Sequence, residues 1–261
     1  MSTDHTLYEQ DNGLAFLTFN RPEARNAMTW EMYQAVVERC DTVETDPSIR
    51  VLILRGAGGR AFVSGTDISQ FRTFSSPEAG IDYEERLDTV IDRLESVSKP
   101  TIAQIDGVAT GGGCALVAAC DLRICTPTSR FGVPIARTLG NCLSAANHAR
   151  FLDLVGPAHL KDILYTGRLL NAAEALDVGL VNQVVESTQL DEAVRKTAQT
   201  IAANAPLTIK ATKEIIRRIH AHRRLPADAA RDQIVMCYAS DDFREGVESF
   251  LGKRAPRWTG S

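Results

Sequence analysis

Apolar and polar positions along the chain follow two periods, one typical of strands and one typical of helices. Residues 6–10 and 14–20 flank the turn sequence Asp-Asn-Gly, which predicts a β-hairpin. Thr29 can cap a helix to about Glu44, because the apolar positions after it recur every three or four residues. Residues 51–56 are a short apolar run ending in glycine, which predicts a buried strand.

The same alternation continues through the middle of the chain. Apolar residues at helical spacing predict an amphipathic helix over 78–97, and residues 99–107 contain the next strand. Another strand and turn are expected within 121–132, followed by a helix from about 143 to 155. Residues 171–179 begin with a capping-box spacing and end in glycine, which predicts one further helix.

This order of elements predicts the fold class and the division of the chain. Strands and helices alternate through about 185 residues, which is typical of a layered α/β core. Beyond that point the pattern is helical, interrupted by Pro206 and Pro226. We therefore expect a core over 1–190 and a helical region over 191–261.

Two predicted strand-to-helix corners are rich in glycine or small polar residues. Gly111 to Gly113 precede an apolar helix, and Ser64 to Asp67 follow a strand and end at a residue that can cap a short helix. Backbone N–H groups at a helix start are unpaired and favour negative charge. Two such corners could aim two N–H groups at one oxygen, as in an oxyanion hole. Close packing alone would also explain the glycines, and neither phosphate-binding glycine pattern is present.

Composition and charge limit the classes of partner that the protein is expected to bind. The chain is 44% apolar with a net charge of −4 and has no basic block, which argues against nucleic acid as a partner. No apolar run is long enough to cross a membrane, and the polar, acidic N-terminus resembles no targeting peptide. We expect a cytoplasmic protein.

Cysteine and histidine positions do not indicate a metal site. The six cysteines form no CxxC pair, and the two neighbouring histidines, His220 and His222, would point to different faces of a helix. Reduced, buried thiols are the expected state.

Five segments together resemble a known family. They are NRPEARNAM (20–28), AFVSGTDI (61–68), IDGVATGGGCALVAACDLRI (105–124), APLTIKATKEII (205–216) and DFREGVESFLGKRAPRWTG (242–260). In this order they are similar to the enoyl-CoA hydratase/isomerase, or crotonase, superfamily.

The resemblance implies a fold, a substrate and an assembly. The fold would be a spiral of ββα turns with a C-terminal helical trimerisation region. The partner would be an acyl-CoA thioester, with coenzyme A as part of the substrate and no other cofactor. The chain would form a homo-trimer or a hexamer built as a dimer of trimers.

The resemblance also assigns residues. The backbone N–H groups of Thr66 and Gly112 would hold the thioester oxygen. Ala24 would lie near the adenine and Arg25 near the phosphates, while Phe250 and Lys253 would reach a coenzyme A held by a neighbouring subunit. The positions matched to coenzyme A binding are Ala24, Arg25, Ser64, Asp67, Ile68, Phe250 and Lys253.

The pattern departs from the family at the two acid/base positions. Hydratases of the family carry glutamates where this chain has Ala115 and Ile135, neither of which can move a proton. Ser144, Cys142 and His148 are possible substitutes in the segment expected near the acyl group, although helix capping, a buried thiol and a solvated or structural histidine are the favoured explanations.

Two further carboxylates follow each other on the helix over 78–97. Glu84 and Glu85 are expected to lie on its solvated face, although the family resemblance implies that this helix often borders the acyl chain.

The sequence thus predicts an acyl-CoA enzyme, nominally an enoyl-CoA hydratase or isomerase, that stabilises a thioester enolate. Three alternatives stay open, namely acyl-CoA decarboxylation, thioester hydrolysis, and acyl-CoA binding without catalysis. Decarboxylation would form an enolate by losing CO₂, so it requires no base to remove a proton.

Overall fold

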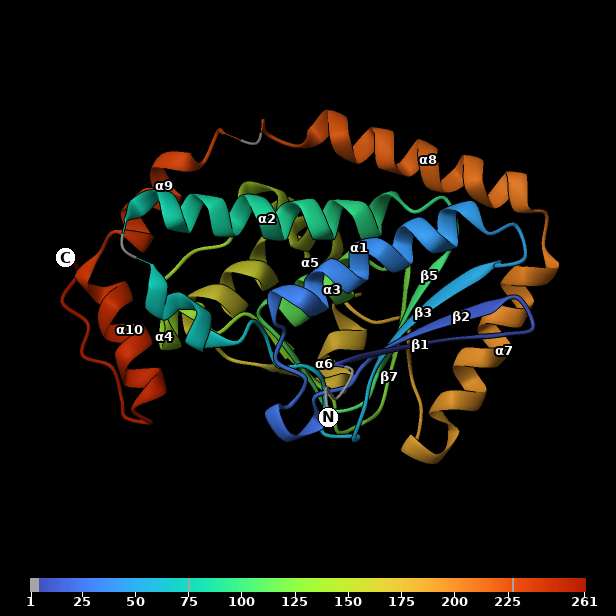
Figure 1. Ribbon diagram of the computed structural model, residues 1–261, viewed down its shortest axis with the longest axis horizontal. Coiled ribbons are helices and arrows are strands. Elements are labelled where there is room, and N and C mark those ends of the chain that lie inside the picture. Colours follow the sequence, from blue (N-terminus) through green and yellow to red (C-terminus); the bar gives the residue numbers. More distant parts are fainter. Residues whose placement is uncertain (1–4, 75, 227) are drawn as a thin grey trace.

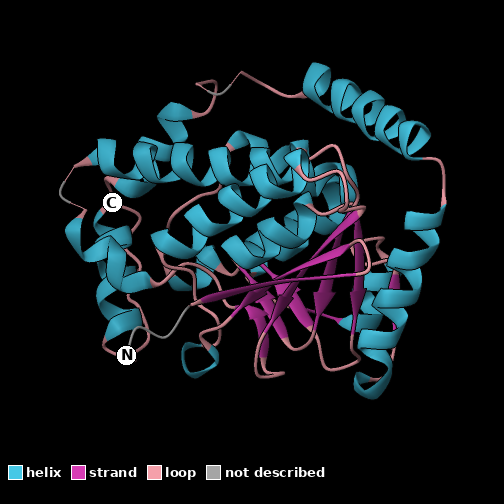
Figure 2. Ribbon diagram, turned by 45° about the vertical axis from the view of Figure 1, so that its right-hand side comes forward, coloured by secondary structure: helices cyan, strands magenta, loops and turns pink. Residues whose placement is uncertain are grey.

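The strands of the protein lie together on one side of a group of helices (Figure 1, Figure 2). A computed structural model describes residues 5–74, 76–226 and 228–261. Six strands form the larger sheet in the order β1 (Thr6–Asp11), β2 (Leu14–Phe19), β3 (Val51–Gly56), β5 (Thr101–Ile105), β7 (Leu122–Cys125) and β10 (Gln183–Val184). β1 and β2 are antiparallel, and the remaining neighbours are parallel.

A second, smaller sheet has the order β4 (Ala61–Val63), β6 (Val108–Thr110), β8 (Arg130–Gly132) and β9 (Leu170–Asn171). β4, β6 and β8 are parallel, and β9 is antiparallel to β8. Successive strands enter the two sheets in turn, β3 then β4, β5 then β6, β7 then β8, and a helix follows each pair. The fold is therefore the predicted α/β spiral of ββα turns.

The helices of the first 190 residues are α1 (Trp30–Thr45), α2 (Pro77–Ser96), α3 (Gly112–Ala119), α4 (Ile135–Thr138), α5 (Ala145–Thr166) and α6 (Ala172–Asp177), with short 3-10 turns η1 (Pro22–Ala24), η2 (Ile68–Thr73) and η3 (Ser187–Gln189). The remaining helices are α7 (Leu190–Ala203), α8 (Pro206–Arg223), α9 (Arg231–Tyr238) and α10 (Asp241–Leu251). α2 packs against α1, α3 and α9 in the upper part of Figure 1.

Residue alternation along β2 shows how the larger sheet is buried on both faces. Ala15 and Leu17 pack into the main core between the sheets and α1, α2, α3 and α5. Leu14 and Phe16 point the other way, into a second core that includes Val194 of α7. Successive strand residues point to opposite faces, so both faces of β2 require apolar side chains.

Local signals in the sequence placed several element boundaries correctly. The hairpin turns at Asn12 and Gly13, which both have positive φ angles. The Thr29 side chain accepts a hydrogen bond from the Met32 N–H and caps α1. Asn171 and Glu174 form the expected capping box at α6.

The helix expected to end near Val155 does end there, and a second helical segment that was not predicted continues to Thr166 within α5. Gly156 leaves helical geometry with φ 70° and ψ 169°, and Pro157 starts the second half. A glycine can take this conformation, and proline is well suited to the first turn of a helix, so the chain bends and resumes instead of stopping.

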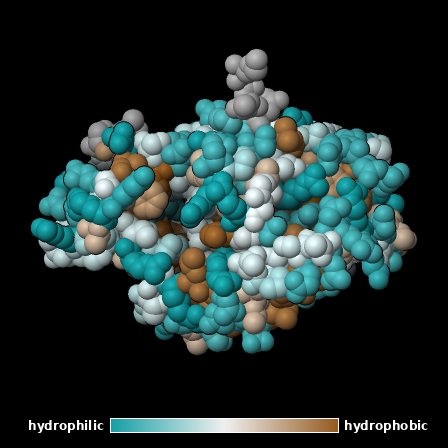
Figure 3. All heavy atoms as spheres, turned by 90° about the horizontal axis from the view of Figure 1, so that it is seen from below, coloured by the Kyte–Doolittle hydropathy of each residue, from teal (hydrophilic) through white to brown (hydrophobic). Residues whose placement is uncertain are grey.

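Figure 3 shows the lower face of the molecule as oriented in Figure 1, which is mostly hydrophilic with several separate groups of apolar residues. Within the described residues, no helix combines the length and the apolar character needed to cross a bilayer.

The tight packing of α3 on β4 gives a stability prediction. A Cβ atom at Gly113 would lie 2.2 Å from the carbonyl oxygen of Val63. We expect Gly113→Ala to push the helix off the strand and lower the free energy of unfolding by about 1–3 kcal/mol. Urea denaturation followed by circular dichroism measures this loss. An unchanged midpoint would show that α3 does not pack this closely.

Candidate functional site

A cavity of about 620 Å³ lies between η1, η2, α2, the start of α3 and α4. The positions singled out from the sequence that line it are Ala24, Arg25, Ser64, Thr66, Asp67, Ile68, Gly112, Ile135 and Phe250. The fold thus brings together residues that are more than 200 positions apart in the chain.

The first corner of the cavity is held by a short parallel bridge between Met28 and Thr66. The Met28 N–H donates to the Gly65 carbonyl at 2.8 Å, and the Asp67 N–H donates to the Met28 carbonyl at 2.9 Å. In a parallel pairing, both bonds belong to the residues that flank Thr66. The Thr66 N–H therefore points away from Met28.

The second corner is the start of α3. Gly111 precedes the helix with φ 54° and ψ −126°, a conformation that suits glycine. Gly112 is the first helical residue, so its N–H has no partner within the helix. A Cβ atom at Gly112 would lie 2.4 Å from the Tyr33 hydroxyl oxygen, so this position has no room for a side chain.

The two corners meet because β4 and β6 are neighbouring parallel strands. A Cβ atom built on Gly111 would lie 3.6 Å from the Gly65 Cα, and one built on Gly112 would lie 3.5 Å from Thr66 Oγ1. Among the residues that the structure describes, neither the Thr66 N–H nor the Gly112 N–H has a hydrogen-bond acceptor. Both residues line the cavity, so two unpaired donors lie on one wall.

The Thr66 side chain is fixed by two tyrosines. Its Oγ1 lies 2.8 Å from the Tyr33 hydroxyl and 2.7 Å from the Tyr83 hydroxyl. Burial raises the pKa of both phenols above the usual value, so both remain neutral. This buried network fixes the Thr66 side chain and thereby supports the backbone that carries its N–H.

Asp67 has a local structural role. Its side chain accepts hydrogen bonds from the Ser69 N–H and hydroxyl and caps η2, as the sequence suggested. Partial burial opposes its ionisation, but hydrogen bonds from Ser69 and Arg21 outweigh that effect and lower its pKa. Asp67 is therefore a carboxylate that is already hydrogen-bonded to Ser69 and Arg21.

The segments matched to coenzyme A binding converge at the mouth of the cavity. Ala24 and the exposed Arg25 end η1, and the Ser64 N–H donates to the Arg25 carbonyl at 3.2 Å. Phe250 of α10 lines the same cavity and is 50% exposed. Lys253 is exposed just beyond α10 and does not line the cavity.

Ala115 and Ile135, the two positions matched to the family's acid/base residues, lie in different surroundings. Ala115 is fully buried in the main core, inside the first turns of α3. Ile135 begins α4 and lines the cavity as a half-buried apolar side chain. Neither position supplies a group that can bind or activate water.

The three suggested substitutes are engaged elsewhere, and none of them lines this cavity. Ser144 caps α5 and its hydroxyl donates to Asp88 at 2.7 Å. The His148 Nδ1 lies 3.0 Å from the Ser144 carbonyl. Cys142 interacts with Cys237, and this hydrogen bond together with burial raises the pKa of Cys142 above the usual value.

Glu84 corrects the sequence-based expectation. It was expected on a solvated face, yet it is 2% exposed and lines the cavity, whereas Glu85 is exposed. Helical spacing could have indicated this, because Glu84 falls three residues after Ile81 and three before Leu87, both buried. Its carboxyl accepts from the Tyr238 hydroxyl at 2.6 Å and from the Ser144 N–H at 3.1 Å.

The environment of Glu84 changes its protonation. Burial raises its pKa to about 8, assisted by the nearby Asp88, and the hydrogen bonds from Tyr238 and Ser144 only partly offset this. At neutral pH Glu84 is therefore mostly protonated, although its pKa is close enough for both forms to be accessible.

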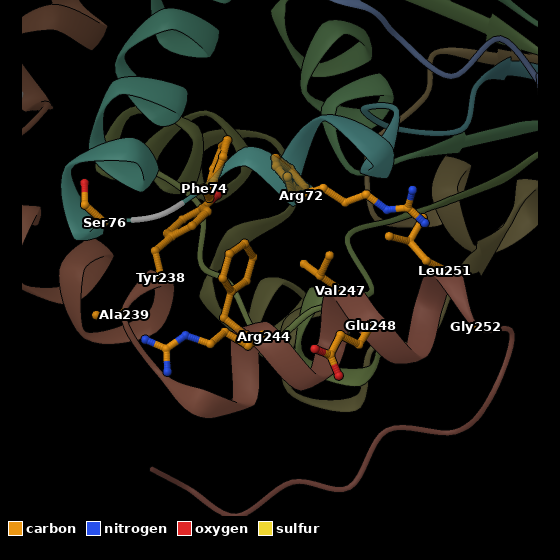
Figure 4. A pocket seen from close by; sticks show the side chains of 12 residues that line it. Arg72, Phe74, Ser76, Tyr238, Ala239, Arg244, Val247, Glu248, Leu251 and Gly252 are labelled. Carbon is orange, nitrogen blue, oxygen red and sulfur yellow. The ribbon is translucent and has the colours of Figure 1, made fainter.

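A second cavity of about 560 Å³ adjoins this region. Figure 4 shows it between η2 and α10, with the rings of Phe74 and Tyr238 on one side. Phe71 lines both cavities. Tyr238 connects them, because its ring lines the second cavity while its hydroxyl binds Glu84 in the first.

Comparison with known proteins identifies the family. A sequence model described as enoyl-CoA hydratase/isomerase matches residues 9–261. The chain belongs to the enoyl-CoA hydratase/isomerase family. It is 34% identical over 257 residues to the crotonyl-CoA hydratase of Syntrophomonas wolfei, with 97% of each chain covered.

Solved structures of this family have the same fold. An enoyl-CoA hydratase/carnitine racemase from Magnetospirillum magneticum has a TM-score of 0.80 and 34% identity, covering 100% of this chain and 97% of its own. A methylmalonyl-CoA decarboxylase in complex with 2-nitronate-propionyl-CoA has a TM-score of 0.91 and 26% identity, with both chains fully covered at 100%. The protein is a crotonase-superfamily acyl-CoA enzyme similar to enoyl-CoA hydratases.

The buried Glu84 gives a prediction on stability and pH. Its folded pKa of about 8 exceeds the usual 4.5, so the folded state holds a proton that the unfolded state releases. The resulting stabilisation is complete below about pH 4.5 and is lost as pH rises through about 8. Relative to Glu84→Gln, we expect the native chain to lose on the order of 4 kcal/mol across this range. Urea denaturation of both proteins at several pH values measures it, and a constant difference would contradict the buried, neutral carboxyl.

Proposed function

We propose that this enzyme stabilises the enolate of an acyl-CoA thioester between the N–H groups of Thr66 and Gly112, as an enzyme of the enoyl-CoA hydratase/isomerase type. The supporting observation is the pair of unpaired N–H donors on one wall of a single cavity. Donors fixed before the reaction stabilise an oxygen as it gains negative charge, and removing one costs roughly 2.7–4 kcal/mol in other enzymes.

The rest of the cavity suits the remainder of the substrate. In this proposal coenzyme A enters beside η1, with Arg25 near its phosphates and Ala24, Ser64, Ile68 and Phe250 along its path. Thr66 and Gly112 then receive the thioester oxygen, and the acyl group extends toward α2 and Ile135. No cofactor beyond the coenzyme A of the substrate is required for this chemistry.

The residues at the family's two acid/base positions favour shifting a double bond over adding water. Ala115 and Ile135 offer no carboxylate to hold a water molecule. Isomerisation needs only the removal and return of one proton, with the electron pair held on the thioester oxygen between the two steps.

Decarboxylation is the second candidate. The likeness to a methylmalonyl-CoA decarboxylase, with a TM-score of 0.91, favours it. Loss of CO₂ leaves the same enolate, so the same two donors would stabilise it. Assays with crotonyl-CoA, but-3-enoyl-CoA and methylmalonyl-CoA, read as hydration, double-bond shift and CO₂ release, separate these reactions. Free coenzyme A would instead indicate thioester hydrolysis, and binding without turnover would indicate a non-catalytic binder.

A pair of variants tests the Gly112 donor. A side chain at Gly112 collides with the Tyr33 hydroxyl, so both variants carry Tyr33→Phe to make room. Gly112→Pro removes the N–H, whereas Gly112→Ala adds a Cβ and keeps it, and proline is tolerated at the first position of a helix. We expect turnover about 10²–10³-fold lower with proline than with alanine on the substrate that the native chain processes. Equal turnover of the two would contradict the role of this N–H.

We also propose the trimer or hexamer expected from the family resemblance. Ile215, Ile216 and Ile219 of α8 are 57%, 48% and 52% exposed, so this helix presents an apolar face that its own chain leaves uncovered. By contrast, Ile234 and Tyr238 of α9 are buried within the chain. Subunit contacts through α8 would cover its isoleucines.

Light scattering tests the assembly. At micromolar concentration we expect the mass of three or six chains. Replacing Ile215 and Ile219 by Lys should reduce that mass, because charged side chains oppose an apolar contact. A native protein that elutes with the mass of one chain would contradict this proposal.

A further inference from the structure

We propose that Glu84 is the group that removes a proton from, and returns it to, the carbon chain of the substrate next to the thioester carbonyl in this enzyme. The proposal rests on the function proposed above, because it assumes an acyl-CoA thioester whose oxygen lies between Thr66 and Gly112. It fills the role left empty by Ala115 and Ile135 from a different element, α2.

The position of Glu84 in the cavity is the first argument. Among the described residues, three with carboxyl side chains line the cavity, and two of them are unsuited to transferring a proton to and from the substrate. Glu23 is exposed to solvent, and Asp67 is held as a carboxylate by Ser69 and the cation Arg21, whereas the hydrogen-bond partners of Glu84 are neutral. Glu84 is buried, and its neighbour Tyr83 contacts Thr66 directly through its hydroxyl. Glu84 thus lines the same cavity as Thr66 and Gly112.

The packing around Glu84 is the second argument. A Cβ atom at Gly80 would lie 2.4 Å from the Tyr238 ring, so the absence of a side chain lets that ring lie against α2. Its hydroxyl then reaches Glu84, one helical turn further on. Asn141, which also lines the cavity, donates to the same hydroxyl at 3.0 Å. A glycine inside a helix costs about 1 kcal/mol relative to alanine, so this arrangement has a stability cost.

The proton step follows from this placement. As a carboxylate, Glu84 takes a proton from the carbon next to the thioester, the C–H electron pair moves into the C–C bond, and the carbonyl π pair moves onto the oxygen. The Thr66 and Gly112 N–H groups stabilise that oxygen. In the reverse direction, protonated Glu84 returns the proton to carbon and becomes a carboxylate. The same return completes a decarboxylation after CO₂ has left.

The groups that face Glu84 determine its pH dependence. They come from α1, α2, α9 and the segment before α5, and are Tyr33, Tyr83, Asp88, Cys142 and Tyr238. Asp88 disfavours the carboxylate, whereas the Tyr238 hydroxyl favours it. With a pKa of about 8, both forms of Glu84 are available near neutral pH.

Proton exchange of butyryl-CoA tests the proposal, because this saturated thioester cannot be hydrated. Butyryl-CoA deuterated at the α-carbon is incubated with the enzyme in ordinary water, and deuterium loss is followed by mass spectrometry. We expect loss with the native chain to rise tenfold per pH unit and level off above about pH 8. Glu84→Gln should slow it at least 100-fold, while calorimetry shows butyryl-CoA still binding.

Two further variants complete the test. Glu85→Gln, on the exposed side of the same helix, should exchange at the native rate. Tyr238→Phe removes a hydrogen bond that favours the carboxylate, so it should shift the rise in exchange to higher pH and leave exchange possible. A merely structural role for Tyr238 would lower the rate without moving the pH profile.

The outcomes separate the two proposals. Native-like exchange by Glu84→Gln would overturn the role of Glu84 and leave the enolate site intact. Exchange absent from the native chain, with butyryl-CoA bound, would contradict the enolate site itself and, with it, this proposal.

Discussion

The parallel pairing of β4 with β6 is the constraint on which the cavity depends. It places the ends of the two strands side by side, so the chain must leave both strands through neighbouring corners. A side chain is excluded by space at Gly113, which lies against Val63, and positive φ angles favour glycine at Gly65 and Gly111. The Gly112 N–H is unpaired because this residue is the first of α3, and the Thr66 N–H because it points away from Met28. Tyr33 and Tyr83 then hold Thr66 from the protein interior.

The buried face of α2 adds the second half of the site. A carboxyl placed among apolar side chains is costly to ionise, and the protein does not fully offset that cost with its two hydrogen bonds. The result is a proton-carrying group whose pKa is close to neutral. An apolar residue at position 84 would avoid the free-energy cost of burying a carboxyl. It would also leave the cavity without a buried acid or base.

Local and periodic features of the sequence were enough to predict an α/β core and several element boundaries. The hairpin, the Thr29 cap and the capping box at Asn171 depend on neighbouring residues, so their signals lie within short segments. The family resemblance supplied the ββα spiral and the matched positions at the cavity. Thr66, Gly112 and Ile135 were placed by it in the cavity that the structure shows.

Other features required the folded chain. Glu84 was missed because acidic residues on a helix are usually solvated, and its partner Tyr238 lies 154 positions away. Ser144 was expected to cap a helix more than to act as an acid or base, and the structure confirms the cap; the hydrogen bond from its hydroxyl to Asp88, 56 positions away, could not be predicted. In both cases the deciding contact is between distant segments.

The central claim is that two backbone N–H groups polarise the thioester carbonyl. Infrared difference spectroscopy of butyryl-CoA labelled with ¹³C at that carbonyl measures the polarisation directly in the bound state. The account predicts a carbonyl stretch at lower frequency when the thioester is bound than when it is free in water, because two fixed donors weaken the C=O bond. An unshifted stretch for the bound thioester would show that its oxygen does not lie between Thr66 and Gly112.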